Sequence, residues 1–277
     1  MREKIYIKIL PQKLGEALGI GISTACFYPL ETQKSFLKVV NTGAKCAEIF
    51  FNSPSEIEIG FLEKIKSVQT EYCINIDTIH PYLSATETYF LFGNYPRRFN
   101  DILSEYRRFF RACNFLGAKY LIIHGCKEPF PISDEEYFER FKKLVDIGKE
   151  YGVLPVQENV HRSKAQRPDF IKKLKEYLGE DFKMVLDIKQ AYRSGEDAFE
   201  FIKLFGEDIV RVHISDNDLT HDCLPPGEGS FDTDRLFKIL NEKNFTGDYI
   251  IELYSHNYKS DEQILNAKKF LEGKLTK

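Results

Sequence analysis

The stretch MVLDIKQAYRSGEDAFEFIKLFGEDIVRVHIS, residues 184–215, contains the repeating unit that decides the fold. Apolar runs at 184–188 and 210–215 flank an amphipathic, helix-like segment at 198–206. Both runs are continuous instead of alternating, which is typical of parallel strands buried on both faces. The unit therefore predicts a strand, a helix and a second strand parallel to the first.

The same unit recurs along the whole chain. Helix-like stretches such as 98–117 and 134–152 alternate with further apolar runs, which lie at 19–28, 47–51, 74–80, 120–124, 153–158 and 249–254. Four of the helix-like stretches end at a glycine, at positions 117, 152, 179 and 247. Glycine is the residue that loops from a helix to a strand prefer at the end of the helix. Strand and helix alternate eight times, which predicts an α/β fold, a (β/α)8 TIM barrel.

We expect this barrel to be a single domain over residues 1–277. Residues 1–18 would form an N-terminal extension of unclear structure, with KIYIKIL at 4–10 as an extra strand or a lid. A doubly wound open sheet is the alternative, and the lack of GxGxxG after the first apolar run disfavours it.

Composition excludes several classes of protein. The 277 residues are 43% hydrophobic, which argues against disorder, and the longest notable charge-free stretch, 17–30, is too short to span a membrane. The start, MREKIYIKIL, lacks the apolar core of a signal peptide. A net charge of −3 argues against a dedicated nucleic-acid binder. Six cysteines without a CxxC pair are expected to be reduced core thiols of a cytoplasmic protein.

Polar residues stand where the predicted strands end, and in a βα barrel this end carries the active site. They are His80, His124, Glu158, Asp187, His213, Asp216 and Glu252. Singly, each fits a structural role: a helix-capping acid, a turn histidine, or a glutamate paired with a lysine. Together, buried carboxylates beside an imidazole need a cationic partner. Few cations occupy these positions, so we expect one divalent ion, Mn, Mg, Co or Zn.

The chain also resembles a known family, the xylose-isomerase-like TIM barrels, which comprise sugar and sugar-phosphate isomerases and epimerases together with endonuclease IV. The segments that carry the resemblance are AEIFF, TIHPYL, IIHG, QENV, LDIKQ, VHISDND, LPPGEGSFD and YIIELY, in this order. The resemblance implies that Glu158, Asp187, His213 and Glu252 bind one divalent metal. Their spacing is similar to that of the ketose 3-epimerase branch.

Endonuclease IV is the first alternative. It is similar at His80 and His124, which are zinc ligands there, but Gln190 replaces the histidine of its LDxxH motif. Its DxH zinc pair, which precedes GEG, becomes His221-Asp222-Cys223. These departures argue against a three-zinc cluster, and we expect no nucleic-acid partner. The epimerase branch also usually has a histidine at position 190; glutamine can donate to a sugar oxygen but cannot carry a proton as imidazole does.

The resemblance thus implies a metal-dependent sugar or sugar-phosphate isomerase or epimerase. Glu158 and Glu252 would be the catalytic acid and base, transferring protons through a metal-bound enediolate, and Asp187 and His213 would only ligate the ion. The predicted substrate-binding residues are His80, His124, Gln190 and Asp216. A dehydratase or lyase acting on a related polyol or keto acid shares all of these residues. The expected partner is a small carbohydrate substrate, and no association with a membrane is expected. A homo-oligomer is compatible with the family.

Further residues surround the predicted site. Lys189 and Arg193 are expected to be solvated loop cations, with contact to a substrate phosphate or carboxylate as the alternative. The PPGEGS segment at 225–230 predicts a turn before a helix capped by Asp232. Tyr254 and His256 would line the pocket if the last strand continues.

Overall fold

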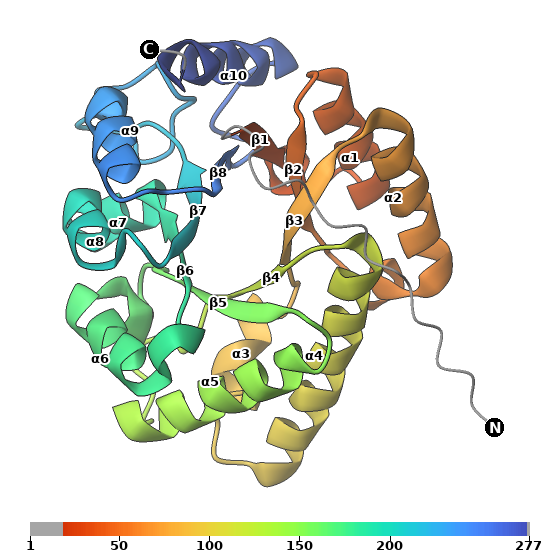
Figure 1. Ribbon diagram of the computed structural model, residues 1–277, viewed down its shortest axis with the longest axis vertical. Helices are drawn as coiled ribbons and strands as arrows, with labels where there is room; N and C mark the ends of the chain where they lie inside the picture. Colours follow the sequence, from red (N-terminus) through yellow and green to blue (C-terminus); the bar gives the residue numbers. More distant parts are fainter. Residues whose placement is uncertain (1–18, 276–277) are drawn as a thin grey trace.

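The computed structural model describes residues 19–275, and within this range eight parallel strands close into one barrel in sequence order, β1 to β8 (Figure 1). Helices surround the strands, and the predicted TIM barrel is confirmed. The segment 4–10, predicted as a strand or lid, lies outside the described residues. The strands are β1 (Ile20–Ser23), β2 (Cys46–Phe50), β3 (Asn75–His80), β4 (Tyr120–Ile123), β5 (Leu154–Glu158), β6 (Met184–Asp187), β7 (Ile209–Ile214) and β8 (Asp248–Ile251).

The helices follow the amphipathic stretches of the sequence. They are α1 (Thr32–Asn41), α2 (Ile59–Tyr72), α3 (Ser84–Phe90), α4 (Pro96–Leu116), α5 (Asp134–Lys149), α6 (Pro168–Leu178), α7 (Ile188–Ser194), α8 (Ala198–Phe205), α9 (Thr233–Glu242) and α10 (Asp261–Leu275). Short 3-10 helices are η1 (Thr24–Phe27), η2 (Pro54–Ile57), η3 (Lys164–Gln166) and η4 (Gly179–Asp181). Asp232 caps α9 by accepting a hydrogen bond from the Arg235 amide, as predicted.

Glycine plays two different roles at the helix-to-strand connections. Gly117 ends α4 in the left-handed conformation, with φ of 84°. Gly247 differs from the prediction, because α9 has already ended at Glu242. A Cβ at Gly247 would clash with the carbonyl oxygen of Val210, so glycine is needed there for the close approach of β7 and β8.

The interior of the barrel is layered. A small apolar layer of Ile122, Val156 and Val185 fills its middle. Toward the N-terminal ends of the strands, the buried guanidinium of Arg211 donates to Asp248 at 2.9 Å and lies 3.4 Å from Asp77. The barrel is therefore packed through, and the polar groups at the C-terminal ends of the strands form a separate layer.

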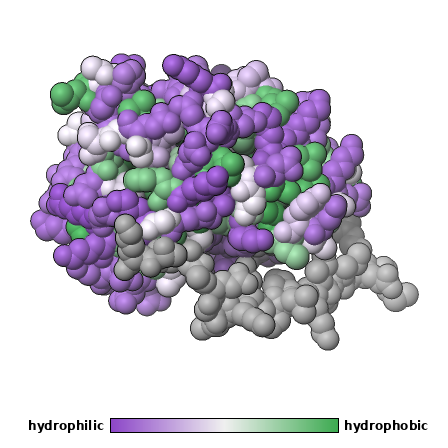
Figure 2. Space-filling model, turned by 90° about the horizontal axis from the view of Figure 1, so that it is seen from above, coloured by the Kyte–Doolittle hydropathy of each residue, from purple (hydrophilic) through white to green (hydrophobic). Residues whose placement is uncertain are grey.

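The surface and the cysteines complete the fold. In the face shown in Figure 2, apolar side chains form small patches among hydrophilic ones. In the described part of the chain, every helix is too short or too polar to cross a membrane. All six cysteines, which fall within that part, are free, and five are buried. The prediction of core thiols is wrong for Cys73, which is exposed at the C-terminal cap of α2, beyond the buried face of that helix.

Candidate metal centre

Three carboxylates and one imidazole meet at the C-terminal ends of neighbouring strands. Glu158 and Asp187 are the last residues of β5 and β6, His213 lies near the end of β7, and Glu252 directly follows β8. Strand register places Asp187 beside His213. One ligand atom from each of the four residues lies within 4.8 Å of the others, so the structure brings together the complete predicted ligand set.

The imidazole of His213 lies at the centre of this group. Its Nδ1 atom is 3.4 Å from Glu158 Oε1, 3.4 Å from Glu252 Oε2 and 3.8 Å from Asp187 Oδ2. Among the described residues this buried nitrogen has no hydrogen-bond partner. Burial alone would lower the pKa of His213, but the charges of Glu48 and Glu252 raise it well above its ordinary value.

This arrangement fits a divalent ion. A buried imidazole nitrogen without a hydrogen bond faces three carboxylate oxygens, and Glu158 Oε2 is likewise buried without a hydrogen bond within residues 19–275. One nitrogen and several carboxylate oxygens are a ligand set suited to Zn, Mn or Co. An ion at this point would satisfy the orphaned nitrogen and offset the carboxylate charges together.

Glu48, on β2, is a site residue that the sequence analysis missed. Its side chain is fully buried, and Oε2 lies 3.0 Å from His213 Nε2. Because a carboxylate only accepts, His213 must donate from Nε2, which leaves Nδ1 to face the other carboxylates when the ring is neutral. The signal was present in the sequence: Glu48 is the one charged residue of the run AEIFF.

A second group of potential ligands shares Glu158. His80 Nε2 and His124 Nε2 are 2.7 Å apart, and they lie 3.8 and 3.0 Å from Glu158 Oε2. Burial would raise the pKa of Glu158, but His124 and the other imidazoles hold it well below its ordinary value. The structure thus places both predicted substrate-binding histidines against Glu158.

Lys189 corrects a prediction. It is 2% exposed, not a solvated loop cation, and its Nζ lies 2.6 Å from Asp187 Oδ2 and 2.9 Å from Glu252 Oε2. The reason is local: α7 begins directly after β6, with Asp187 as its cap, so no loop carries Lys189 away from the barrel. Burial would raise the pKa of Glu252, but Lys189 and His213 hold it well below its ordinary value.

The two other predicted substrate-binding residues have structural partners. Gln190 Oε1 accepts a hydrogen bond from the His161 amide at 3.0 Å. Asp216 is buried and accepts from the backbone amides of Asn217, Gly227 and Phe231, each at 2.9 Å. These contacts favour a role in holding loops at the barrel mouth over the predicted contact with substrate.

Residues farther out cover the mouth of the barrel. The sequence predicts that Tyr254 and His256 line the pocket if the last strand continues past Glu252. β8 ends at Ile251, so these two residues are not part of the strand. The Tyr254 ring lies instead 5.3 Å from Lys189 Nζ, and its hydroxyl accepts from Arg193 at 2.8 Å. Arg193 also pairs with Asp222 and is partly buried, so it too differs from a solvated loop cation.

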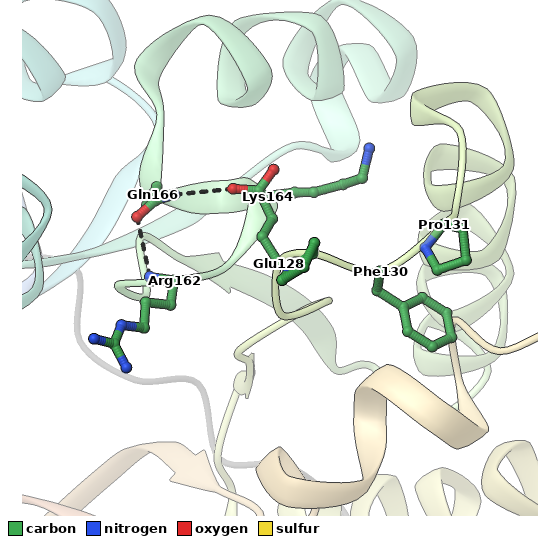
Figure 3. A pocket seen from close by; sticks show the side chains of 7 residues that line it. Glu128, Phe130, Pro131, Arg162, Lys164 and Gln166 are labelled. Carbon is green, nitrogen blue, oxygen red and sulfur yellow. Dashed lines mark hydrogen bonds between the residues drawn. The ribbon is translucent and has the colours of Figure 1, made fainter.

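Residues 221–223, which would carry a further zinc site in an endonuclease, are not part of the candidate metal centre. His221 is exposed and pairs with Asp218, and Asp222 pairs with Arg193. Within residues 19–275, neither His221 nor Asp222 belongs to a group of three potential metal ligands. A separate hollow of about 710 Å³, lined by Glu128, Arg162 and Gln166 among others, also lies apart from these groups (Figure 3).

Comparison with known proteins agrees with this architecture. The sequence profile of the xylose isomerase-like TIM barrel family matches residues 36–274, and the chain belongs to this family. It is 26% identical over 208 residues to an inosose dehydratase of Clostridium perfringens, covering 61% of this chain and 69% of that protein.

Two solved structures are similar over nearly the whole chain. A D-tagatose 3-epimerase-like protein superposes with a TM-score of 0.78 at 18% identity, covering 94% of this chain and 97% of the other. The IOLI protein, solved with a zinc atom, superposes with a TM-score of 0.77 at 19% identity, covering 94% and 98%. At these identities the likeness establishes the shared fold.

Proposed function

We propose that the protein is a metal-dependent isomerase or epimerase of a sugar or sugar phosphate. The observation that carries the proposal is the convergence of Glu158, Asp187, Glu252 and the orphaned Nδ1 of His213 at the active-site end of the barrel. Support also comes from the similar proteins, one named an inosose dehydratase and one a D-tagatose 3-epimerase-like protein.

These four residues would hold the ion. When bound, a divalent ion supplies Lewis-acid polarisation of the substrate carbonyl, which makes the adjacent C–H bond more acidic. Glu48 keeps the Nδ1 lone pair of His213 directed at the site, because it accepts the Nε2 proton. Asp187 also caps α7 through Oδ1, so Oδ2, which accepts from Lys189, is the oxygen that faces the centre.

Glu158 and Glu252 would move the protons. One carboxylate takes the proton from the carbon next to the carbonyl; the C–H electron pair forms the C=C bond of an enediolate, and the C=O π pair moves onto the carbonyl oxygen. The other carboxylate returns a proton, to the opposite face of the same carbon in an epimerase. His124 Nε2 lies 3.0 Å from Glu158 Oε2 without a hydrogen bond to it, and its side chain is 22% exposed; by turning to donate to that oxygen, His124 would carry protons between Glu158 and solvent.

A dehydratase is the second candidate. The favouring observation is the pair His80 and His124, which lie together beside Glu158 and offer an acid for a leaving hydroxyl group. Elimination would use the same first step, removal of the proton next to the carbonyl, followed by loss of the β-hydroxyl as water. The similarity to a protein named an inosose dehydratase supports elimination, as the similarity to a D-tagatose 3-epimerase-like protein supports epimerisation.

A substrate panel in D2O tests the proposal. Ketoses, inososes and their phosphates are incubated with the protein and a divalent ion and followed by NMR. Deuterium at one carbon with conversion between sugars is expected for an isomerase or epimerase. Loss of water from the substrate would select the dehydratase, and neither exchange nor elimination across the panel would refute both.

A further inference from the structure

Lys189 contacts the same oxygen atoms that face the candidate metal position. Its Nζ atom lies 2.6 Å from Asp187 Oδ2 and 2.9 Å from Glu252 Oε2. These are the atoms that lie 3.8 and 3.4 Å from His213 Nδ1. The ammonium and a divalent ion would therefore use the same two ligand oxygens.

Lys189 is held in this place by its surroundings. Only 2% of its side chain is exposed, and the Tyr254 ring lies 5.3 Å from Nζ. Tyr254 is in turn bound by Arg193 through its hydroxyl. A lysine on a surface loop would lose side-chain entropy to make such contacts, whereas Lys189 is fixed by packing, by the buried carboxylate of Asp187 and by the half-buried carboxylate of Glu252.

We propose that Lys189 is a resident cation of the metal centre, whose ammonium a divalent ion must displace from Asp187 or Glu252 in order to bind. The inference rests on the proposed metal site and adds a residue that sets its affinity. Glu158, Asp187 and Glu252 bring three carboxylates to this point, and the Lys189 ammonium already offsets part of their charge, so a divalent ion competes with it for the same oxygens. Removing the ammonium frees both oxygens and removes the repulsion between two cations.

The test is Lys189→Met, which keeps an unbranched side chain and removes the charge and the donors. Binding of Mn²⁺ and Zn²⁺ to the full, metal-stripped chain is measured by calorimetry. We expect about 10–100-fold tighter binding than in the wild type, the range over which outer-shell groups change metal affinity. Lys268→Met is the matched control: Lys268 is 7% exposed and pairs with Glu272 on α10, so its removal should leave metal affinity unchanged.

Thermal unfolding separates this role from a purely structural one. Without added metal, Lys189→Met should melt below the wild type, because the buried carboxylate of Asp187 and the half-buried carboxylate of Glu252 lose their cation. With saturating Mn²⁺ the difference should shrink or reverse. A structural lysine would lower the melting temperature by the same amount in both conditions. If Lys189→Met does not fold, Lys189→Gln, which keeps hydrogen-bond donors without the charge, should also bind metal more tightly than the wild type.

The outcomes distinguish the inference from the proposed function. If the wild type binds metal and the neutral variants bind it equally or more weakly, the inference is overturned and the metal site stands. If only the variants bind metal, the inference is supported and metal-dependent activity of the natural chain is refuted. If none of them binds, both are overturned.

Discussion

Replacing Glu48 by glutamine should weaken the metal centre without removing any ligand. Glu48 is buried on β2 and accepts from His213 Nε2 at 3.0 Å. Glutamine has nearly the same shape and keeps a carbonyl acceptor, but it lacks the negative charge. The substitution therefore tests whether that charge fixes the tautomer and raises the basicity of His213.

The expected size of the effect follows from the burial of the contact. A hydrogen bond to a charged group contributes about 1.5–3 kcal/mol to stability, and the upper part of this range applies where solvent is excluded. Loss of a carboxylate behind a histidine ligand typically costs about 10–100-fold in metal affinity. We expect Glu48→Gln to bind Mn²⁺ weaker by this factor.

The pH dependence of stability gives an independent readout. The pKa of His213 is raised in the folded protein, and Glu48 is the largest of the causes that raise it. Its contribution to stability is complete below the unfolded-state pKa of about 6.5 and is lost as pH rises through the higher folded value. The metal-stripped wild type should therefore lose stability as pH rises above about 6.5, and Glu48→Gln should lose less.

The assay compares calorimetric Mn²⁺ titration with denaturant unfolding across this pH window. Glu56→Gln is the matched control, because Glu56 is also buried and accepts hydrogen bonds, from Thr32 and the Asn52 amide, away from the candidate centre. It should lower stability at every pH and leave metal affinity unchanged. Wild-type metal affinity together with an unaltered pH profile in Glu48→Gln would refute the positioning role.

Three other predictions concern the proposed chemistry and the barrel itself. Glu158→Gln and Glu252→Gln should keep most of the bound metal but slow exchange of the substrate C–H with D2O by about 10²–10⁴-fold. The activity of His213→Ala should instead be partly rescued by excess metal. Near-normal exchange in both glutamine variants would refute the two-carboxylate mechanism. The protein should not incise duplex DNA at an abasic site with zinc present, since Gln190 replaces a zinc ligand; clear incision, or three zinc ions per chain, would favour the endonuclease. Arg211→Met should cost about 3–5 kcal/mol of unfolding free energy, because it leaves Asp248 and Asp77 without their buried partner, and a loss below about 1 kcal/mol would contradict this account.

The fold and the four-residue cluster follow from local patterns in the sequence. Continuous apolar runs predicted strands buried on both faces, and a parallel barrel places all strand ends on one side. Glu158, Asp187 and His213 stand at those ends, so their convergence needed only the count and order of the strands. Their roles as ligands or bases stay predictions, because no contact within the protein decides between them.

Other parts of the site depend on contacts that no local pattern contains. Glu48 lies 165 positions before its partner His213. The role of an acid inside an apolar run can be recognised only once the barrel brings β2 and β7 together. Lys189 looked like a loop residue because it follows a strand. Whether it is buried depends on where α7 begins, and helix starts are poorly fixed by sequence.

The two glutamates proposed to move protons have different neighbours, and this difference bears on how they would share the work. Glu158 faces His124, whose pKa burial would lower but the charge of Glu158 raises, and whose side chain partly reaches the surface, so a proton on Glu158 has a path to solvent. Glu252 faces Lys189 beneath the ring of Tyr254, and a lysine holds its protons at neutral pH. Under the proposed function, Glu158 would exchange its proton with solvent in each turnover, while Glu252 would keep the proton that it takes from the substrate. Transfer on the Glu252 side would then retain more of the substrate's own hydrogen, and the deuterium found in the product of a complete turnover would enter mainly through Glu158.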